Sequence, residues 1–234
     1  TEVTFTLEGQ GLSRTATVRT RDQTAQAVFP GLEVMEWSAE NPVLYNVYVE
    51  TASGCVKERL GFRTVEIQGD RFLINGRKVK LKGVNHHDTS PTNGYTLTPY
   101  EIERDLLLCK AYNIDTIRTS HYPPDPLLPE LADELGLYLV DENDLETHGI
   151  FAHQLPPAFN SISHDSKWEG HYLDRIRRLY HRDKLHGNTS VIMWSLGNES
   201  GGYHNTDAMY HYLKARSSLP VHYEGVIHSG RQAY

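Results

Sequence analysis

The sequence lacks long apolar segments, an excess of positive charge and a cysteine framework. No apolar run approaches the roughly 18 residues needed to cross a bilayer, and the first residues carry no signal-peptide pattern. The formal net charge of −7 argues against a nucleic-acid partner, because phosphate binding needs a basic face. Two cysteines, Cys55 and Cys109, are present, and they predict no disulfide framework. We therefore expect a cytoplasmic protein with neither a membrane nor a nucleic-acid partner.

The chain has enough apolar material for one large domain or two modest ones, because 38% of its 234 residues are hydrophobic and 23% are charged. Residues 1 to about 62 alternate apolar and polar side chains in short runs, and the clearest runs are residues 3–7, 16–19 and 45–49. This alternation predicts an antiparallel β-sandwich. A complete sandwich has about seven strands, and roughly five can be counted, so part of one is expected.

From about residue 78 the pattern changes to strand, helix, strand, helix. Thr98 and Glu101 form a capping box with Pro99 at the first helical position, and Asp125 opens a second helix that Gly136 ends. Strands are predicted at residues 79–84, 116–118, 137–140, 191–195 and 221–223, and a long helix at 168–185. Such repeats imply a parallel sheet covered by helices. A complete (β/α)8 TIM barrel takes about 250 residues, so roughly its first half is expected here.

Two polar segments follow predicted strands. Residues 140–149 continue from the apolar run 137–140, and residues 195–201 continue from the apolar run 191–194. In a barrel of parallel strands, the carboxyl ends of the strands form the mouth at which catalysis is built. The pair Asn198-Glu199 therefore places a carboxylic acid at that mouth, beside an amide that can bind a sugar hydroxyl. Taken alone, this dipeptide fits an ordinary loop better than a catalytic site.

Five motifs have an order and a spacing that match a known family. They are Gly83-Val84-Asn85-His86-His87-Asp88, Arg118-Thr119-Ser120-His121-Tyr122-Pro123, Val140-Asp141-Glu142-Asn143-Asp144-Leu145-Glu146-Thr147-His148-Gly149, Ser195-Leu196-Gly197-Asn198-Glu199-Ser200-Gly201 and His222-Tyr223-Glu224-Gly225. With these motifs the chain resembles the retaining β-galactosidases of glycoside hydrolase family two over essentially its whole length. The related β-glucuronidases and β-mannosidases share the Asn-Glu pair but not the surrounding motifs, so a galactosidase is the better match.

The resemblance implies a multidomain fold. Residues 1–64 would be part of an immunoglobulin-like β-sandwich, and residues 65–234 would be the N-terminal half of the TIM-barrel catalytic domain. Four or five parallel strands would leave two open edges where a closed barrel has none. We therefore expect the isolated chain to be marginally stable or to self-associate. Homo-oligomers are common in the family, and a homo-oligomer is expected for the complete enzyme.

The resemblance also implies that Glu199 is the acid/base of a retaining double displacement. Such a reaction needs two carboxylates about 5 to 5.5 Å apart, one of which protonates the leaving oxygen while the other attacks the anomeric carbon. In the family the nucleophile is a glutamate at the end of the seventh barrel strand, which would lie beyond residue 234. Glu224 matches a family position that is not the nucleophile. The isolated chain is therefore predicted to be inactive.

Glu146 and His148 are two residues apart, so in an extended backbone both side chains point to the same face. A carboxylate oxygen and an imidazole nitrogen together suit a divalent cation, although such a pair alone is better explained by a surface salt bridge. The resemblance implies that Glu146, His148 and Glu199 bind Mg²⁺. A sodium ion is also expected from the family, but the motifs do not locate its ligands.

The remaining motif residues are expected to form part of a sugar pocket. By resemblance, His87 and His121 contact the galactosyl ring and stabilise the transition state, and Asn198 binds the sugar 2-hydroxyl; the alternative for each histidine is a core position satisfied by backbone. Arg118 is expected to orient neighbouring carboxylates through a bidentate pair. Four further residues are expected to support these groups: His86, Asp88, Asp141 and Glu142. Residues 150–166 are expected to form a long loop at the mouth.

The resemblance implies hydrolysis of terminal, non-reducing β-D-galactosides of the lactose type. Two alternatives remain open at this stage. One is another family-two glycosidase, such as a β-glucuronidase. The other is a non-catalytic chain that binds sugar or complements a partner, which would bind galactose without hydrolysing it.

Overall fold

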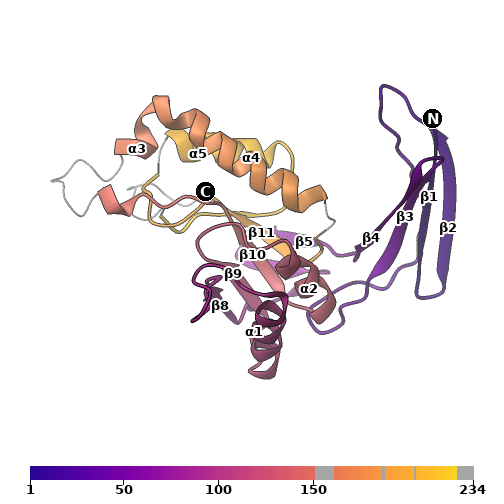
Figure 1. The fold of residues 1–234 in the computed structure, drawn as a ribbon, viewed down its shortest axis with the longest axis horizontal. Helices are drawn as coiled ribbons and strands as arrows, with labels where there is room; N and C mark the ends of the chain where they lie inside the picture. Colours follow the sequence, from indigo (N-terminus) through magenta and orange to yellow (C-terminus); the bar gives the residue numbers. More distant parts are fainter. Residues whose placement is uncertain (151–160, 186–187, 203, 226–234) are drawn as a thin grey trace.

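The computed structural model describes residues 1–150, 161–185, 188–202 and 204–225. These residues form one four-stranded, one three-stranded and one five-stranded sheet, together with helices (Figure 1). The strands are β1 (Glu2–Gly9), β2 (Leu12–Arg19), β3 (Tyr45–Thr51), β4 (Gly54–Leu60), β5 (Val65–Gln68), β6 (Arg71–Ile74), β7 (Arg77–Lys78), β8 (Gly83–His86), β9 (Thr116–Thr119), β10 (Tyr138–Glu142), β11 (Val191–Ser195) and β12 (Val221–His222). The helices are α1 (Pro99–Ala111), α2 (Leu127–Leu135), α3 (Ser161–His164), α4 (Glu169–Leu185) and α5 (His204–Lys214), with short 3₁₀ turns η1 (His148–Ile150) and η3 (Ser166–Trp168).

The N-terminal sheet is antiparallel and has the strand order β2-β1-β3-β4. The three runs predicted from alternation lie in β1, β2 and β3, so these predictions are confirmed. The alternation did not single out β4, because the charged residues 57–59 interrupt its apolar pattern. Residues 1–60 thus supply one sheet, and the immunoglobulin-like sandwich stays a prediction.

The five-stranded sheet is parallel, with the order β12-β11-β10-β9-β8. Strands consecutive in the chain are therefore neighbours, as right-handed strand–helix repeats require. Along the chain α1, α2, α4 and α5 follow β8, β9, β10 and β11, and α1 packs beside α2 and α4 beside α5 (Figure 1). Among the described residues β8 and β12 each pair on one side only, which is the open sheet predicted for part of a barrel.

The local signals for the helices are confirmed. The Thr98 hydroxyl accepts a hydrogen bond from the Glu101 backbone N–H, and the Glu101 carboxylate accepts one from the Thr98 backbone N–H. The Asp125 carboxylate accepts the Leu127 N–H at the start of α2, and Gly136 ends that helix with φ of 75°. The apolar positions Ile102, Leu106 and Cys109 form the buried stripe of α1, and Tyr172, Ile176 and Leu179 lie buried on α4.

The predicted barrel strands differ from the observed ones by at most two residues at their ends, except that the first begins four residues later than expected. Residues 79–84 were expected to form the first barrel strand, but β8 begins at Gly83. The reason is that β7 pairs with β6 in an antiparallel hairpin, and residues 79–82 then connect this hairpin to the barrel sheet. The predicted loop at residues 150–166 lies largely outside the described residues. The part of it that is described contains α3 and the start of η3. No helix in the described ranges combines the length and apolar character that a membrane span requires.

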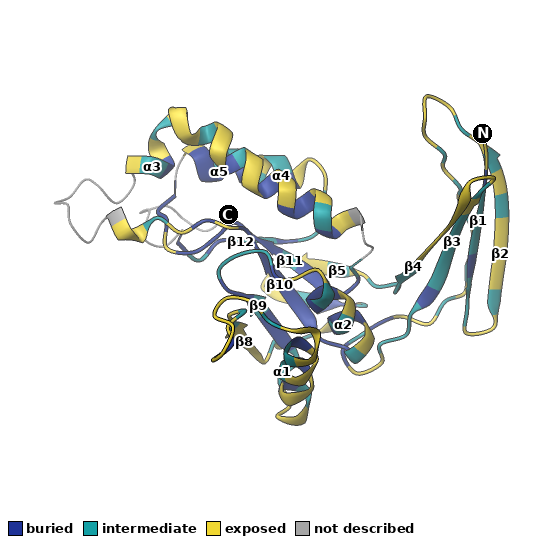
Figure 2. Cartoon of the chain, viewed as in Figure 1, coloured by how far each residue is buried: buried dark blue, intermediate teal, exposed yellow. Residues whose placement is uncertain are grey.

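The main core lies between the parallel sheet and its helices. β10 is buried along its whole length and β11 nearly so, and both appear dark blue in Figure 2. This burial on both faces is typical of a parallel sheet in an α/β protein. Residues at the ends of these strands are therefore held on a rigid support.

A segment near Trp37 connects the N-terminal sheet to the barrel strands. Trp37 is fully buried, its ring lies edge-on to Tyr138 at the start of β10, and its Nε1 donates to the Asp133 carbonyl at 2.9 Å. Arg63 donates from Nε to the Thr189 carbonyl at 2.6 Å and from Nη2 to the Val191 carbonyl. These contacts lie at the amino ends of β10 and β11, so the opposite, carboxyl ends are left to build the site.

Candidate active site

The loops after β10 and β11 are joined by main-chain contacts beyond the sheet. The Asn198 N–H donates to the Leu145 carbonyl at 2.8 Å, and Glu146 and Asn198 form an isolated parallel bridge. Gly197 makes this approach possible, because it has φ of 139° and a Cβ there would lie 2.6 Å from the Leu145 oxygen. The backbone itself therefore brings Glu146 next to Asn198 and Glu199.

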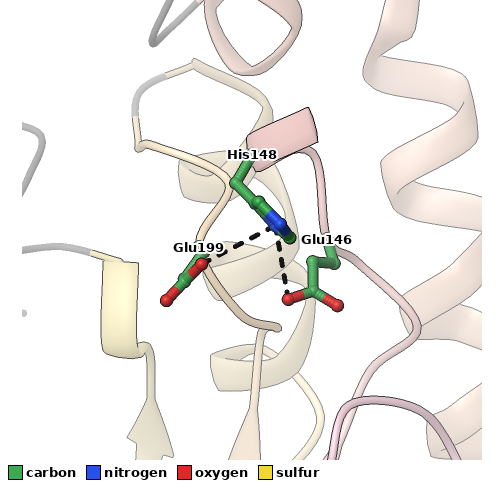
Figure 3. A group of neighbouring side chains, drawn as sticks. All are labelled: Glu146, His148 and Glu199. Atoms are coloured by element: carbon green, nitrogen blue, oxygen red, sulfur yellow. Dashed lines mark ion pairs between the residues drawn. The ribbon is translucent and has the colours of Figure 1, made fainter. Parts of the chain in front are cut away.

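Three predicted metal ligands converge at this junction, as Figure 3 shows. The Nδ1 atom of His148 lies 3.4 Å from Oε1 of Glu146 and 3.6 Å from Oε2 of Glu199. One ligand atom from each residue lies within 4.8 Å of the others, and all three residues are exposed to solvent. Two carboxylate oxygens and one imidazole nitrogen around a shared point can hold a divalent cation.

Asn198 is held between a cation and a carboxylate. Its Oδ1 accepts a hydrogen bond from Arg118 Nη2 at 3.0 Å, and its Nδ2 donates to Glu146 Oε1 at 2.7 Å. Its amide orientation is therefore fixed by protein groups at the edge of the mouth. The binding of a sugar hydroxyl by this amide stays a prediction.

Arg118 makes the predicted bidentate pair, and its partner is Glu142. Nε of Arg118 donates to Oε2 of Glu142 at 2.6 Å, and Nη2 donates to Oε1 at 3.0 Å. Glu142 is fully buried at the carboxyl end of β10. A buried carboxylate is stable only where charge and hydrogen bonds compensate its desolvation, and this guanidinium supplies both.

The two predicted sugar-contacting histidines lie together. The rings of His87 and His121 are perpendicular, with centroids 5.3 Å apart, and His121 Nδ1 lies 2.6 Å from Glu142 Oε1. His86 does not join them: its ring nitrogens lie 3.4 Å from Asp88 and 3.3 Å from Asp105 of α1. Hydrogen bonding to Asp88, together with Asp105, raises the pKa of His86 against the opposing effect of burial. Successive residues of a strand point to opposite faces, which explains the separation of His86 from His87.

Sequence reasoning gave no role to two residues that belong to this cluster. The Ser195 hydroxyl donates to Glu142 Oε2 at 2.6 Å and lies 3.1 Å from Nδ1 of His222. Burial, followed by the positive charge of Arg118, lowers the pKa of His222. Ser195 and His222 are register partners in β11 and β12. Pairing the last residues of the two predicted strands with each other could have placed Ser195 beside His222.

Glu224 has a place in the site that the sequence did not indicate. Its Oε2 accepts a hydrogen bond from the backbone N–H of Glu199 at 2.8 Å. Glu199 has φ of 32°, a region that residues other than glycine rarely adopt. The bond from Glu224 thus holds the backbone of the expected acid/base in an uncommon conformation.

Asp141 does not support the mouth, contrary to expectation. It neighbours Glu142 on β10 and, since strand side chains alternate, it faces the helix layer instead. It is fully buried and interacts with Asp183 of α4. The Asp183 carboxylate also accepts two hydrogen bonds from Arg182, from Nε at 2.6 Å and from Nη2 at 2.7 Å. Burial, followed by the nearby charge of Asp183, raises the pKa of Asp141 well above its usual value.

Replacing Asp141 by asparagine is expected to flatten the pH dependence of stability. As pH rises above about 4, the unfolded chain releases the Asp141 proton before the folded chain does, so the free energy of unfolding falls by up to about 1.4 kcal/mol per pH unit until the folded pKa is passed. The asparagine side chain has no such proton to release. Urea unfolding at several values between pH 5 and 8 measures the slopes, and Asp174→Asn on the exposed side of α4 is the control. Parallel slopes for wild type and the Asp141 variant would contradict the expectation.

This architecture, with polar groups gathered at the carboxyl ends of parallel strands, is that of the β/α-barrel enzymes. The family model described as "Glycosyl hydrolases family 2, TIM barrel domain" matches residues 65–233. The chain therefore belongs to family 2 of the glycosyl hydrolases.

Curated relatives agree with this assignment. The chain is 49% identical over 193 residues to a β-galactosidase of Arthrobacter sp. (strain B7). This match covers 82% of this chain and 18% of the relative. It is 38% identical over 202 residues to a β-galactosidase of Staphylococcus xylosus, covering 85% of this chain and 20% of the relative. The chain thus spans about a fifth of the length of these relatives.

Solved structures show the same fold. A β-glucuronidase of Bifidobacterium dentium complexed with coumarin-3-O-glucuronide has a TM-score of 0.72 at 21% identity, over 95% of this chain and 37% of that one. A β-glucuronidase of Dictyoglomus thermophilum has a TM-score of 0.68 at 22% identity, over 95% of this chain and 39% of that one. At such identities the likeness establishes the fold alone.

Proposed function

We propose that the natural full-length protein is a retaining β-galactosidase and that this chain supplies its acid/base and part of its sugar pocket. The observation that carries the proposal is the meeting of Glu146, His148 and Glu199 at the barrel mouth, in a chain 49% identical to a β-galactosidase. The nucleophile would come from outside this chain. The isolated 234-residue chain is therefore proposed to be inactive.

In this proposal Glu199 first donates a proton to the leaving glycosidic oxygen and then takes one from the attacking water. Asn198 binds the 2-hydroxyl beside the reacting carbon, and His87 and His121 bind other hydroxyls of the galactosyl ring. Hydrogen bonds to hydroxyls that strengthen as the ring flattens favour the transition state over the ground state. Glu224 supports this chemistry by holding the Glu199 backbone.

The substrate assignment is tested by comparing turnover of p-nitrophenyl β-galactoside and p-nitrophenyl β-glucuronide by the natural full-length protein. A glucuronide carries a carboxylate that needs a cation, and Arg118 at the mouth is already paired with Glu142. We expect kcat/KM to favour the galactoside by roughly a hundredfold or more, as for a site that cannot pair a substrate's polar group. A preference for the glucuronide would establish the alternative glycosidase, and galactose binding without turnover of either would establish a non-catalytic protein.

We also propose that Glu146, His148 and Glu199 hold Mg²⁺. The donor set fits, because magnesium prefers oxygen ligands and tolerates water in the remaining positions, with one imidazole nitrogen as a departure from an all-oxygen set. A bound magnesium ion would supply positive charge beside Glu199 and order its carboxylate. The exposure of all three side chains leaves room for water ligands. Sodium is proposed as a further ion without assigned ligands.

Removal of the metal is expected to lower kcat/KM by roughly tenfold or more, because the charge beside Glu199 and the order of its carboxylate are lost. The measurement is turnover of an aryl β-galactoside after dialysis against a chelator, with metal content followed by elemental analysis, and then after addition of Mg²⁺. In Glu146→Gln the response to Mg²⁺ should be weakened, while Glu103→Gln on the exposed face of α1 should respond as wild type does. Full activity of a demonstrably metal-free protein would rule out the magnesium proposal.

Several broader features are proposed from the family. Residues 1–64 would belong to an immunoglobulin-like sandwich, which the single antiparallel sheet β1–β4 supports, and residues 65–234 to the catalytic barrel. The full-length enzyme would be a cytoplasmic homo-oligomer acting on lactose-type galactosides, with neither membrane nor nucleic acid as a partner.

A further inference from the structure

One buried carboxylate links four neighbouring barrel strands at the mouth. Glu142 ends β10, and its side chain receives hydrogen bonds from Arg118 of β9, from His121 just after β9 and from Ser195 of β11. Through Ser195 it reaches His222 of β12. The side chain of Glu142 has no exposed surface, so the protein alone determines its contacts.

The acceptor capacity of Glu142 is fully used. Oε1 receives Arg118 Nη2 at 3.0 Å and His121 Nδ1 at 2.6 Å, and Oε2 receives Arg118 Nε and Ser195 Oγ, each at 2.6 Å. Two bonds to each oxygen occupy the four lone pairs of an ionised carboxylate. Such a carboxylate can only accept, so the proton between Glu142 and His121 resides on Nδ1 of the histidine.

The same reasoning extends to the second histidine. Ser195 gives its single hydroxyl proton to Glu142, so towards His222 it can only accept. The short approach of His222 Nδ1, 3.1 Å from Ser195 Oγ, is then an N–H donated by the histidine. One carboxylate thereby sets the proton positions of two imidazoles, one just after β9 and one at the end of β12.

Arg118, the remaining partner of Glu142, connects this carboxylate to the loop that contains Glu199. Arg118 Nη2 bonds both to Glu142 and to Oδ1 of Asn198, and Asn198 in turn donates to Glu146. The amide group of Asn198 is oriented by this sequence of contacts. The ring of His121 is oriented by its own bond to Glu142, which turns its other nitrogen away from that carboxylate, and it lies perpendicular to His87.

We propose that Glu142 is a positioning residue for glycoside hydrolysis: it fixes the Nδ1-protonated tautomers of His121 and His222, directs Nε2 of His121 to the sugar, and orients Asn198 through Arg118. This inference rests on the proposed β-galactosidase function. Glu142 does not touch the substrate, and it acts through residues that do. A catalytic histidine held in the wrong tautomer can cost several orders of magnitude in kcat, which makes such a carboxylate consequential.

The test uses Glu142→Gln in the natural full-length protein. Glutamine keeps the size of the side chain, but its NH₂ group cannot accept from the two donors that one carboxylate oxygen now serves. We expect kcat on an aryl β-galactoside to fall roughly a hundredfold or more, with a smaller change in KM, in protein that remains folded by circular dichroism. Ser195→Ala removes one hydrogen bond to Glu142 and the connection to His222 but leaves the bonds from Arg118 and His121, so a smaller loss of roughly tenfold is expected.

A double-mutant cycle separates positioning from general structural support. If Glu142 acts through His121, the loss in kcat for Glu142→Gln combined with His121→Ala should be no greater than about the larger single loss, because residues that act as a unit are not additive. Asp133→Asn is the matched control, since Asp133 is also a buried carboxylate but accepts the Thr189 and Ser190 N–H groups at the opposite end of the barrel. Its effect on kcat should be slight, and it should combine multiplicatively with that of His121→Ala.

The outcomes are distinct. Folded Glu142→Gln with kcat within twofold of wild type, or losses that multiply with those of His121→Ala, would overturn the positioning role. If Glu142→Gln does not fold, the same cycle between Ser195→Ala and His222→Ala decides, and multiplying losses there would again overturn it. A wild-type protein that turns over no galactoside would instead refute the proposed function, before any variant is compared.

Discussion

Replacing Glu199 by glutamine is expected to lower kcat of the natural full-length protein on a β-galactoside by about 10²- to 10⁴-fold. Glutamine preserves the shape of the side chain but can neither donate nor take up the proton that the leaving oxygen and the water require. The loss should be greatest for alkyl galactosides and for lactose, whose leaving groups need protonation. It should be smaller in the first chemical step for a dinitrophenyl galactoside, whose leaving group departs without a proton.

Pre-steady-state and steady-state rates on these two kinds of substrate provide the measurement. Glu169→Gln is a suitable control, because Glu169 is a half-buried carboxylate at the start of α4 whose partner is His204. The acid/base assignment would be wrong if Glu199→Gln retained wild-type rates on lactose. It would also be wrong if the loss were the same for both leaving groups.

Replacing Trp37 by alanine is expected to lower the free energy of unfolding by about 3 to 5 kcal/mol. The indole is fully buried against Tyr138, and its N–H bonds the Asp133 carbonyl at 2.9 Å. Alanine leaves a cavity at the amino end of β10 and removes a donor from a buried carbonyl, which adds to the cost. Urea unfolding followed by circular dichroism measures the change.

Trp168→Ala is the matched control for that experiment. Trp168 is 37% exposed, so its removal should cost distinctly less, about 1 to 2 kcal/mol. Equal costs for the two substitutions would show that the Trp37 segment does not hold the N-terminal sheet to the barrel. A large loss for Trp37→Ala, with kcat of the folded natural full-length protein unchanged by the same substitution, would fit the separation of this contact from the mouth.

The features that sequence predicted well are those set by local chemistry. The capping box at Thr98 and the glycine that ends α2 act within a few residues, and both were found where expected. The strand–helix alternation was likewise visible, because buried parallel strands and amphipathic helices have different periods. The bounds of β8 were missed because the competing β6–β7 hairpin is decided by pairing, which an apolar run such as residues 79–84 does not reveal.

The candidate site was predictable in part. Residue type and family resemblance identified Glu146, His148 and Glu199, and the structure brings the three together. The contacts of Ser195 with Glu142 and His222 depend on register between strands far apart in sequence, so no local pattern signals them. The hydrogen bond from the Glu199 backbone to Glu224 likewise joins residues far apart in sequence. Whether the Asp141 side chain points to the mouth or to the helix layer depends on how β10 is oriented in the sheet, which no local pattern reveals.

The main-chain contact between Leu145 and Asn198 has a consequence for how such a site can change over evolution. The spacing between the loop that carries Glu146 and the loop that carries Glu199 is set by backbone groups and by Gly197, rather than by the side chains that face the ligand. Side chains around the mouth can therefore be exchanged while the distance between the two loops is preserved. Gly197 itself is not free to vary, because any side chain there would meet Leu145 of the facing loop.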